Sequence, residues 1–551
     1  MPSISSPSAP DTGAYASHTL DHHGLVAGMV DELGLVGKID ALIRQDLDQR
    51  RVSVGMAVKA LILMGLGFTQ CALYLTPQFF ADKPVERLLG AGLAAGHLND
   101  DALGRALDAI HAYGVESFYY LLAVGVVKQL GLSCAGGHLD ATSFHVDGEY
   151  NHSDEVVAEG VVHIRPGYSR DHRPDLNQVV LQLITENQAG IPLLMAASSG
   201  NINDQIGFRA LVQRHIEQLK VEVGLQYLVA DSALYSEGSL RELGDMVWIS
   251  RVPETFGAAR ALIDAVADDL AASTKDTVHR AVGVVAAGVR QRWLVVYSRA
   301  ARLQAEATLR RQHAKQGEIE LKAFDRLRRQ RFACEADAQA ALEAFSQDLT
   351  LTEVQAGGIV RQTPPPRTGR PAKHPKPDTI RYAVEGHLAS RIDVHARRLQ
   401  RKSCFIVATN DTVGTVLDDE QAIDAYCKDQ QKVERGFRFL KDPLFMASTL
   451  FLKSPERIMA LMAIMTLCLL VYAALEYRIR QGLAQQTLTF PDQKGKPTQQ
   501  PTARWVFLFF AGIHLLTLPS LAQVVLNLAP HHRVLLAVLG ERYISLYANS
   551  G

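Results

Sequence analysis

Residues 426–441 read Tyr-Cys-Lys-Asp-Gln-Gln-Lys-Val-Glu-Arg-Gly-Phe-Arg-Phe-Leu-Lys. Apolar residues in this stretch recur at steps of four and three, which is the spacing of one helix face: Val433, Phe437 and Leu440. Glu434 lies on an adjacent polar face with Arg438 and Lys441. We therefore predict a helix that presents one carboxylate beside cations. Such a face suits a site that binds metal ions and phosphate groups together, provided that partner acids lie elsewhere in the chain.

Two upstream acids are the candidate partners of Glu434. Asp140 is the only acid in a predicted strand at residues 138–146, and Asp231 ends a predicted apolar strand at residues 226–231. Acids at strand ends commonly contribute to sites. Plainer alternatives stay open at this point, because Asp140 could be a solvent-facing strand residue and Asp231 could simply start a turn.

Three converging carboxylates are hard oxygen ligands for Mg²⁺, for which Mn²⁺ can substitute. Two such ions can activate a water or a 3′-hydroxyl and stabilise the leaving oxygen of a phosphodiester. This chemistry further needs cations that orient the phosphates, and Arg438 and Lys441 are the candidates on the Glu434 helix. The alternative for both cations is a solvated helix face.

Composition bounds the class of protein. The chain has 551 residues, of which 47% are hydrophobic and 21% charged, so it is a folded protein of several domains and not a disordered scaffold. The net charge of -1 gives no global signature of polyanion binding, and any contact with nucleic acid must rest on local clusters. The six cysteines are scattered without metal-ligand spacing, which indicates reduced thiols in a cytosolic protein.

One apolar stretch raises the question of a membrane. Residues 458–475 are apolar for 18 residues apart from a threonine and a tyrosine hydroxyl, which is marginally long enough to span a bilayer. Arg457 and Glu476 flank the stretch, and it begins 17 residues after Lys441. We therefore favour a core helix, apolar on all sides, over a membrane anchor.

The pattern of predicted secondary structure changes along the chain. Residues 20–133 show helical spacing, whereas the next segment reads as successive strands and then helix, strand, helix, strand, which is typical of a mixed α/β sheet of the ribonuclease H type. The predicted divisions are a disordered tail at 1–19, a helical DNA-binding or dimerisation domain at 20–133, the first part of a ribonuclease H-like catalytic domain at 134–252, an α+β insertion with a basic helix and a Pro-rich linker at 253–402, the second catalytic part at 403–480 and a helical C-terminal region at 481–551.

These motifs together resemble the DDE transposases of bacterial insertion sequences. The resemblance covers roughly residues 20 to 530 and rests on Asp140, Asp231, the long insertion, and Tyr426 with Glu434 and Lys441. It is specific for the subgroup with a β-containing insertion before the final acid and a tyrosine, arginine, glutamate, lysine signature. The segments at 167–179 and 200–204 also resemble that family. Two departures stand out: Gln430 occupies the arginine position of the signature, and Tyr426 lies one residue farther from Glu434 than is commonest.

The resemblance implies a function. It implies that Asp140, Asp231 and Glu434 are catalytic and bind two Mg²⁺ ions, and that the protein cleaves the ends of a mobile element and joins the 3′-hydroxyl ends to target DNA. Tyr426 would then grip phosphate beside Arg438 and Lys441. A homodimer on paired double-stranded DNA ends, in the bacterial cytoplasm at the nucleoid, is the expected assembly, with no small-molecule substrate.

Further contacts with DNA are expected from the insertion and from basic loops. Relatives with this insertion often hold a flipped base on an insertion-domain tryptophan, for which Trp293 is the candidate, with an ordinary core aromatic as the alternative. Arg170 and Arg173 belong to a basic loop, and two more clusters lie at 367–376 and 397–402. Two other functions stay open: a ribonuclease H-like nuclease without strand transfer, and a metal-independent DNA-binding repressor derived from a transposase.

Overall fold

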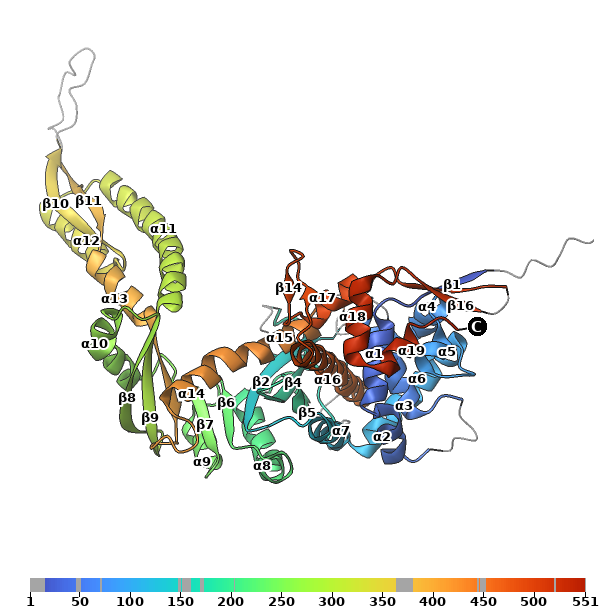
Figure 1. Cartoon of the computed structure of the whole chain (residues 1–551). Coiled ribbons are helices and arrows are strands. Elements are labelled where there is room, and N and C mark those ends of the chain that lie inside the picture. Colours follow the sequence, from blue (N-terminus) through green and yellow to red (C-terminus); the bar gives the residue numbers. More distant parts are fainter. Residues whose placement is uncertain are drawn as a thin grey trace, which may run out of the picture. The chain divides into compact units, whose positions relative to one another are not determined.

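The computed structural model describes residues 15–45, 51–69, 72–146, 150, 160–168, 173–202, 204–362, 380–442, 445, 452–519 and 522–550; at 204–205 and 429–434 it describes the backbone alone. The chain forms two compact units (Figure 1). The first unit comprises Met1–Ser250, Val285–Val289 and Thr409–Gly551, and the second comprises Arg251–Val284 and Arg290–Ala408. The boundaries of the six predicted divisions stay a prediction.

The first unit begins with a helical bundle. Its helices are α1 (His23–Glu32), α2 (Leu35–Leu42), α3 (Val54–Leu66), α4 (Thr76–Ala81), α5 (Val85–Leu89), α6 (Asp100–Tyr113) and α7 (Val115–Gln129). Side-chain caps start two of them, because the Ser53 hydroxyl accepts a hydrogen bond from the Met56 N–H and the Asn99 side-chain Oδ1 accepts one from the Ala102 N–H. These caps satisfy N–H groups that a helix start leaves without partners.

The apolar stretch at 458–475 lies within α16 (Pro455–Gln485), which is the core helix of this bundle. It packs against α1, α3, α6 and α7. By length and composition α16 could cross a membrane, but 94% of its most apolar window is buried inside the protein. Ion pairs anchor both ends, from Arg457 to Asp108 of α6 and from Arg478 to Glu32 of α1, each at 2.7 Å. The apolar surface of α16 is therefore covered by protein.

The chain termini form a small sheet that the sequence did not predict. Strand β1 (Ala16–Thr19) pairs antiparallel with β15 (His514–Thr517), which pairs with β16 (Gln523–Leu526). The prediction of a disordered tail at 1–19 is wrong for Ala16–Thr19, because the backbone of this segment pairs with a strand about 500 residues away, as the register of Ala16 with Thr517 shows. Composition carries no information on such pairing.

The C-terminal region was predicted to be helical, and this is only partly correct. Helices α17 (Ala503–Phe509), α18 (Pro530–Leu539) and α19 (Glu541–Leu546) alternate with β15, β16 and two short strands, β13 (Phe490–Pro491) and β14 (Pro497–Thr498). Apolar runs as short as four residues read as helix or strand equally well. Backbone pairing with distant strands decides between them.

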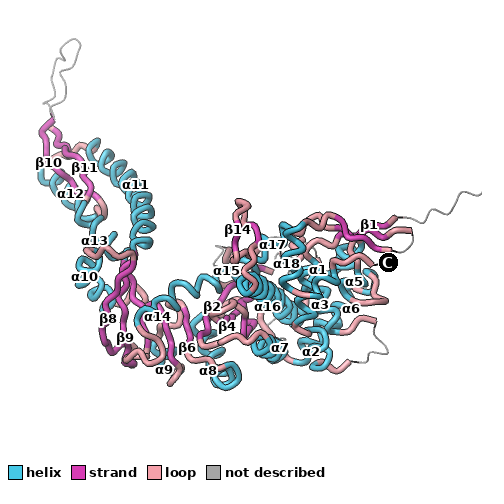
Figure 2. Tube along the Cα trace, in the orientation of Figure 1, coloured by secondary structure: helices cyan, strands magenta, loops and turns pink. Residues whose placement is uncertain are grey.

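A mixed sheet follows the first bundle helices, which confirms the predicted mixed α/β class. Its strands in this unit are β2 (Gly136–His145), β3 (Arg165–Pro166), β4 (Asn177–Glu186), β5 (Pro192–Ser199), β6 (Tyr227–Ala230) and β7 (Val247–Arg251). The order is β3-β4-β2-β6-β7, with β5 also paired to β4. Strands β4, β2 and β6 of this sheet lie side by side (Figure 2). The β2–β4 and β4–β5 pairs are antiparallel, whereas β2–β6 and β6–β7 are parallel. Helix α8 (Asp204–Val223) connects β5 to β6, and α9 (Glu237–Glu242) connects the parallel strands β6 and β7.

Glycine at the start of β2 permits its alignment with β6. A Cβ atom on Gly136 would lie 2.5 Å from the ring of Tyr227, its partner in the parallel register. The Tyr227 hydroxyl accepts a hydrogen bond from the Asn187 side chain at 3.1 Å, which holds that ring in place. This close approach sets the register of the strands that carry the candidate acids.

The second unit has its own helices, strands and core. Its elements are α10 (Gly257–Ala271), β8 (Thr277–Ala286), β9 (Val289–Ser298), α11 (Arg299–Arg329), α12 (Glu335–Asp348), β10 (Thr352–Gln362), β11 (Arg381–Ser390), α13 (Ile392–Ser403) and β12 (Cys404–Thr409). Helices α11 and α12 pack on the β10–β11 hairpin. A cluster of buried apolar residues lies between them: Phe324, Leu327, Leu342 and Val384.

After β12 the chain returns to the first unit through three helical segments. These are α14 (Asp419–Asp424), a π-helical turn η3 (Ala425–Asp429) and α15 (Gln430–Leu440). Helix α15 packs against β2 and α16, and η3 lies against β6. The predicted helix around Glu434 is thus confirmed as α15.

Candidate active site

The register of two parallel strands brings Asp140 and Asp231 together. Leu139 of β2 is paired with Ala230 of β6, and each acid is the next residue along its strand. Neighbouring strands lie about 4.8 Å apart, so the Cα atoms of these two acids are separated by roughly that distance. Paired positions on neighbouring strands project to the same face of a sheet. Both side chains are half-buried.

Short hydrogen bonds to the backbone orient each of these acids. Asp140 Oδ1 accepts from the Ala141 N–H at 2.7 Å, and Asp231 Oδ1 accepts from the Ala233 N–H at 2.9 Å. The Asp231 carbonyl accepts from the Ser250 hydroxyl at 2.8 Å, which ties the end of β6 to β7. Asp231 therefore does start a turn, as its plainer interpretation required. A carboxylate has several acceptor positions, so an aspartate that starts a turn can also be a metal ligand.

The third predicted acid lies on the helix that packs on the acid-bearing strands. Glu434 belongs to α15, which contacts β2, the strand of Asp140. Tyr426 belongs to η3, which contacts β6, the strand that leads into Asp231. The side chain of Glu434 lies outside the described part of the structure. Its convergence with the two aspartates stays a prediction that the helix position supports.

The predicted phosphate-binding cations differ in their surroundings. Arg438 is exposed and Lys441 half-exposed, both at the C-terminal end of the α15 segment. Arg173 is exposed but paired with Asp175 at 2.8 Å, which neutralises much of its charge. Arg170 and the basic cluster at 367–376 lie outside the described residues.

The structure bears on two expectations about the insertion, namely an accessible Trp293 and a basic cluster at 397–402. Trp293 is 1% exposed, and its indole N–H donates to Gln291 Oε1 at 2.8 Å, so the ring lies in the core and offers no face to a base in this conformation. In the basic cluster at 397–402, Arg397 pairs with Asp393 and Arg401 pairs with Asp264. These acids reduce the positive potential that α13 presents to solvent.

Carboxylates on β2 and after β6 suit a divalent cation. Among the described side chains no group of three or more His, Cys, Asp or Glu gathers as a metal site. Asp140 and Asp231 supply two hard oxygen donors, and the helix that would supply the third has its Glu434 side chain outside the described set. The donors present therefore fit Mg²⁺ or Mn²⁺ and do not fit a thiolate- or imidazole-bound metal.

Asp411 is a residue that the sequence did not single out. Its carboxylate accepts five hydrogen bonds of 2.9–3.1 Å, from the backbone N–H groups of Gly414, Thr415, Val416 and Leu417 and from the Thr415 hydroxyl. These bonds shape the loop that precedes α14, η3 and α15. The segment Asp-Thr-Val-Gly-Thr reads as an ordinary turn, and only the folded loop shows how many amides converge.

The chain matches two protein-family models. Residues 136–471, which are more than half of the chain, match the family described as Transposase DDE domain, and residues 15–124 match a Domain of unknown function (DUF4277). No curated protein matches the chain. Among solved structures, a cryo-EM structure of the piggyBac transposase synaptic complex with hairpin DNA is similar at 8% identity and a TM-score of 0.34, covering 89% of this chain and 80% of that one.

Proposed function

This chain belongs to the DDE transposases of insertion sequences, and from that premise we propose that Asp140, Asp231 and Glu434 form its catalytic centre. In the proposed reaction the enzyme hydrolyses the ends of a mobile element and joins the freed 3′-hydroxyl ends to target DNA. The observation that carries the proposal is the β2–β6 register, which makes Asp140 and Asp231 neighbours under helix α15. A ribonuclease H-like topology for this sheet is part of the proposal.

Divalent metal ions are the cofactor of this family, and we assign two Mg²⁺ ions, replaceable by Mn²⁺, to the three carboxylates. Bound there, such ions activate the attacking hydroxyl and stabilise the leaving oxygen. The protein's own contribution is to hold the two aspartates in one orientation through the Ala141 and Ala233 amides. Arg438 and Lys441 would hold the phosphates of the reacting strand.

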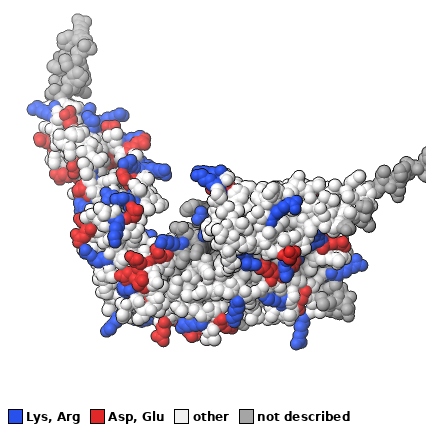
Figure 3. All heavy atoms as spheres, viewed as in Figure 1, with Lys and Arg blue, Asp and Glu red and all other residues white. Residues whose placement is uncertain are grey.

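The second unit offers a surface for the DNA backbone. One face of α11 carries cations at steps of four, seven, four and three residues: Arg311, Lys315, Lys322, Arg326 and Arg329. All five are exposed, and the buried residues Leu309, Phe324 and Leu327 lie on the opposite side of the helix. This cationic stripe extends for about 27 Å at 1.5 Å per residue. On the visible face of this unit, cations and acids are intermixed (Figure 3), so a local stripe matters more than total charge.

Most cations of the stripe have no acidic partner among the residues that the structure describes. Lys322 pairs with Glu318 at 2.6 Å. Arg311, Lys315, Arg326 and Arg329 make no ion pair with any residue that the structure describes. Fixed, exposed cations in a row attract phosphates by releasing the counterions of DNA. A homodimer that holds two DNA ends in the bacterial nucleoid is the assembly that we propose around such contacts.

Cleavage of labelled DNA carrying the element's ends tests the proposed centre. Asp140→Asn, Asp231→Asn and Glu434→Gln keep the shape of each side chain but remove a metal-binding charge, so we expect each to lower Mg²⁺-dependent nicking by about a thousandfold or more. Asp245→Asn is the matched control, because Asp245 is exposed and outside the site. Nicking by any of the three variants at close to the wild-type rate would falsify the assignment.

Strand transfer needs a separate measurement. Supplying pre-cleaved ends and a target plasmid should give joined products with the wild-type protein. Cleavage without joining would instead support the nuclease interpretation. Binding of the ends that is indifferent to metal, without any cleavage, would support a repressor.

A further inference from the structure

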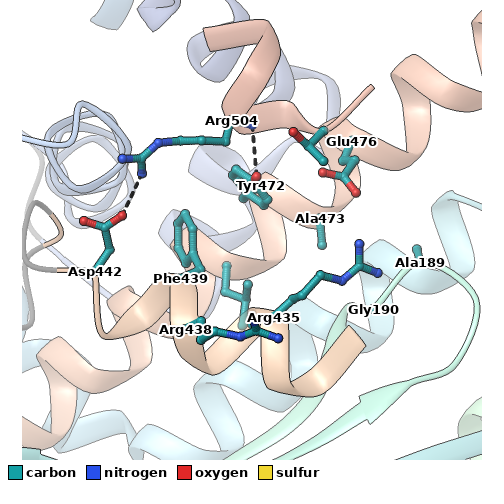
Figure 4. A pocket seen from close by; sticks show the side chains of 13 residues that line it. Ala189, Gly190, Arg435, Arg438, Phe439, Asp442, Tyr472, Ala473, Glu476 and Arg504 are labelled. Atoms are coloured by element: carbon teal, nitrogen blue, oxygen red, sulfur yellow. Dashed lines mark hydrogen bonds and ion pairs between the residues drawn. The ribbon is translucent and has the colours of Figure 1, made fainter. Parts of the chain in front are cut away.

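A cavity of about 440 Å³ lies on another face of the helix that carries Glu434 (Figure 4). Its walls come from α15, α16, the start of α17 and the turn between β4 and β5, all within the first unit. The volume falls in the range of sites for small ligands. Of the predicted site residues whose side chains the structure describes, only Arg438 contributes to its lining.

Aromatic and apolar side chains form one wall of the cavity. The rings of Phe439 and Tyr472 lie with centroids 4.7 Å apart and planes at 40° to each other. Leu469 and Ala473 continue this wall along α16. A Cβ atom on Gly436 would lie 3.1 Å from Leu469 Cδ2, so glycine at that position allows α15 and α16 to approach. The wall therefore suits a flat, apolar ligand group.

The acids of the cavity are already neutralised. Asp442 forms an ion pair with Arg504 at 3.0 Å, and the Arg504 guanidinium also lies 3.8 Å from the centroid of the Phe68 ring. Glu476 pairs with Arg480 at 2.6 Å through one oxygen and accepts from the Ala503 N–H at 2.9 Å through the other. Neither carboxylate thus presents an uncompensated charge to a ligand.

Arg435 supplies a cation to the cavity, in addition to Arg438. It is exposed on α15 and makes no hydrogen bond or ion pair with any residue that the structure describes. Figure 4 shows its side chain reaching across the cavity toward the turn that contains Ala189 and Gly190. That turn is rigid, because Glu186 accepts hydrogen bonds from the N–H groups of Gln188, Ala189 and Ile191. An anionic group held by Arg435 would meet a preformed rim.

We propose that this cavity binds one nucleotide of an unpaired DNA strand, with the base against Phe439 and Tyr472 and a phosphate at Arg435. A nucleotide combines the flat apolar group and the negative charge that the cavity complements. Because Arg435 follows Glu434 in α15, a strand held here runs beside the proposed catalytic centre. The inference rests on the proposed function in one respect, namely that DNA is the substrate.

Fluorescence of a short oligothymidylate with one 2-aminopurine tests the site on the full-length protein. EDTA keeps the DNA intact, so this measurement does not depend on cleavage. We expect binding to quench the fluorescent base, as stacking on aromatic rings does, and an oligonucleotide with an abasic residue at that position to bind roughly tenfold more weakly. Equal binding of the two oligonucleotides would overturn the proposal.

Two variants separate the cavity from general DNA affinity. Arg435→Gln removes the unpaired charge and should weaken binding of both oligonucleotides by roughly five- to tenfold. Ala473→Leu fills the cavity without changing charge, and it should abolish quenching while leaving the abasic oligonucleotide unaffected. Arg533→Gln is the control, because Arg533 is exposed on α18 and has no ion pair among the described residues. Thermal melting confirms that each variant is folded.

The remaining arms distinguish the source of the nucleotide. Free 2-aminopurine deoxyribonucleotide should compete poorly, because it lacks the neighbouring phosphates of a strand. Competition equal to that of the oligonucleotide would overturn the assignment to DNA and indicate a site for free nucleotides. Unchanged quenching by Ala473→Leu would also overturn it. Either result leaves the proposed function standing if Mg²⁺-dependent nicking is intact, so the two failures are distinguishable.

Discussion

Asp411 shows how one carboxylate positions the elements of the candidate site. It is 7% exposed and accepts hydrogen bonds from the backbone N–H groups of residues 414–417 in the loop that precedes α14. Burial alone would raise its pKa, but the hydrogen bonds from Leu417, Val416 and Thr415 outweigh burial and lower the pKa to about 2. The ionised form is therefore the one that the fold stabilises.

Asp411→Asn should destabilise the protein in a pH-dependent way. Because the folded pKa is lowered from 3.8 to about 2, the carboxylate contributes stability above pH 3.8 and loses that contribution as the pH falls toward 2. We expect the substitution to lower the free energy of unfolding by about 2 kcal/mol at neutral pH. Urea unfolding at several pH values measures this.

The difference between wild type and Asp411→Asn should shrink as the pH falls through that window. Asp245→Asn, an exposed acid on the surface of the same unit, should show almost no difference at any pH. A constant difference across the window would show that Asp411 acts through shape and not through its charge.

Residue patterns predict two acids of the candidate site for a physical reason. A lone acid in an otherwise apolar strand stands out in the sequence, which makes Asp140 and Asp231 candidates beside their alternatives as a solvent-facing strand residue and the start of a turn. The sequence does not predict that Tyr472 and Arg504 line the cavity beside α15. Both residues lie on helices that follow α15, and a hydrogen bond from the Arg504 backbone N–H to the Tyr472 hydroxyl joins them. No local spacing encodes such contacts.

At the scale of elements, the helix around Glu434 is not uniform. Sequence periodicity predicted one helix over residues 426–441, whereas the structure has a π-helical turn at Ala425–Asp429 and an α-helix only from Gln430. A π turn closes hydrogen bonds from i to i+5 and so takes up one residue more than an α turn. The extra residue between Tyr426 and Glu434, a departure from the commonest signature, is absorbed there. Period-based prediction assumes 3.6 residues per turn and cannot show this.

Neutralising the cationic stripe on α11 should weaken DNA binding in a salt-dependent way. Arg326→Gln with Arg329→Gln removes two exposed cations that have no ion pair among the described residues. Each lost phosphate contact should lower the slope of log K against log salt by about 0.9, so a loss of about two is expected. Titrations of labelled duplex at several salt concentrations measure the slope.

The same helix provides the matched control for that experiment. Arg310 and Arg328 lie off the stripe and pair with Glu306 at 2.6 Å and Asp325 at 3.7 Å. Arg310→Gln with Arg328→Gln removes the same number of charges from α11 and should leave the slope nearly unchanged. Equal losses in both double variants would show that total charge, and not the stripe, governs binding.

At the scale of the molecule, burial distinguishes a helix in a protein core from a helix in a membrane, which hydropathy alone does not. The apolar stretch in α16 is long and apolar enough to cross a membrane, yet in the first unit α16 packs against α1, α3, α6 and α7. Hydropathy measures the side chains of one helix, whereas its environment depends on segments several hundred residues away. Arg457, one of the flanking charges that argued for a core helix in the sequence, forms an ion pair with α6, and Arg478 near the other end of α16 forms one with α1.

Glu320 is a buried carboxylate through which the stability of the second unit can be tested separately from that of the first. This carboxylate is 5% exposed on α11 and accepts hydrogen bonds from Gln316 and from the backbone and hydroxyl groups of Thr350 and Thr352. Burial would raise its pKa, but the bonds from Thr352, Gln316 and Thr350 prevail and lower the pKa from 4.5 to about 2. Glu320 thereby joins α11 to the start of β10, next to the core around Phe324.

Glu320→Gln should therefore loosen the second unit and leave the first intact. We expect a loss of about 2 kcal/mol at neutral pH, because a charged acceptor of several bonds becomes a neutral amide. The lowered pKa means that this loss is full above pH 4.5 and fades as the pH falls toward 2. Hydrogen exchange read by mass spectrometry should show faster exchange in α11, α12 and β10 and unchanged exchange in α16. Glu318→Gln, on an exposed face of α11, should change neither. Faster exchange in both units with Glu320→Gln would mean that they unfold as one cooperative body.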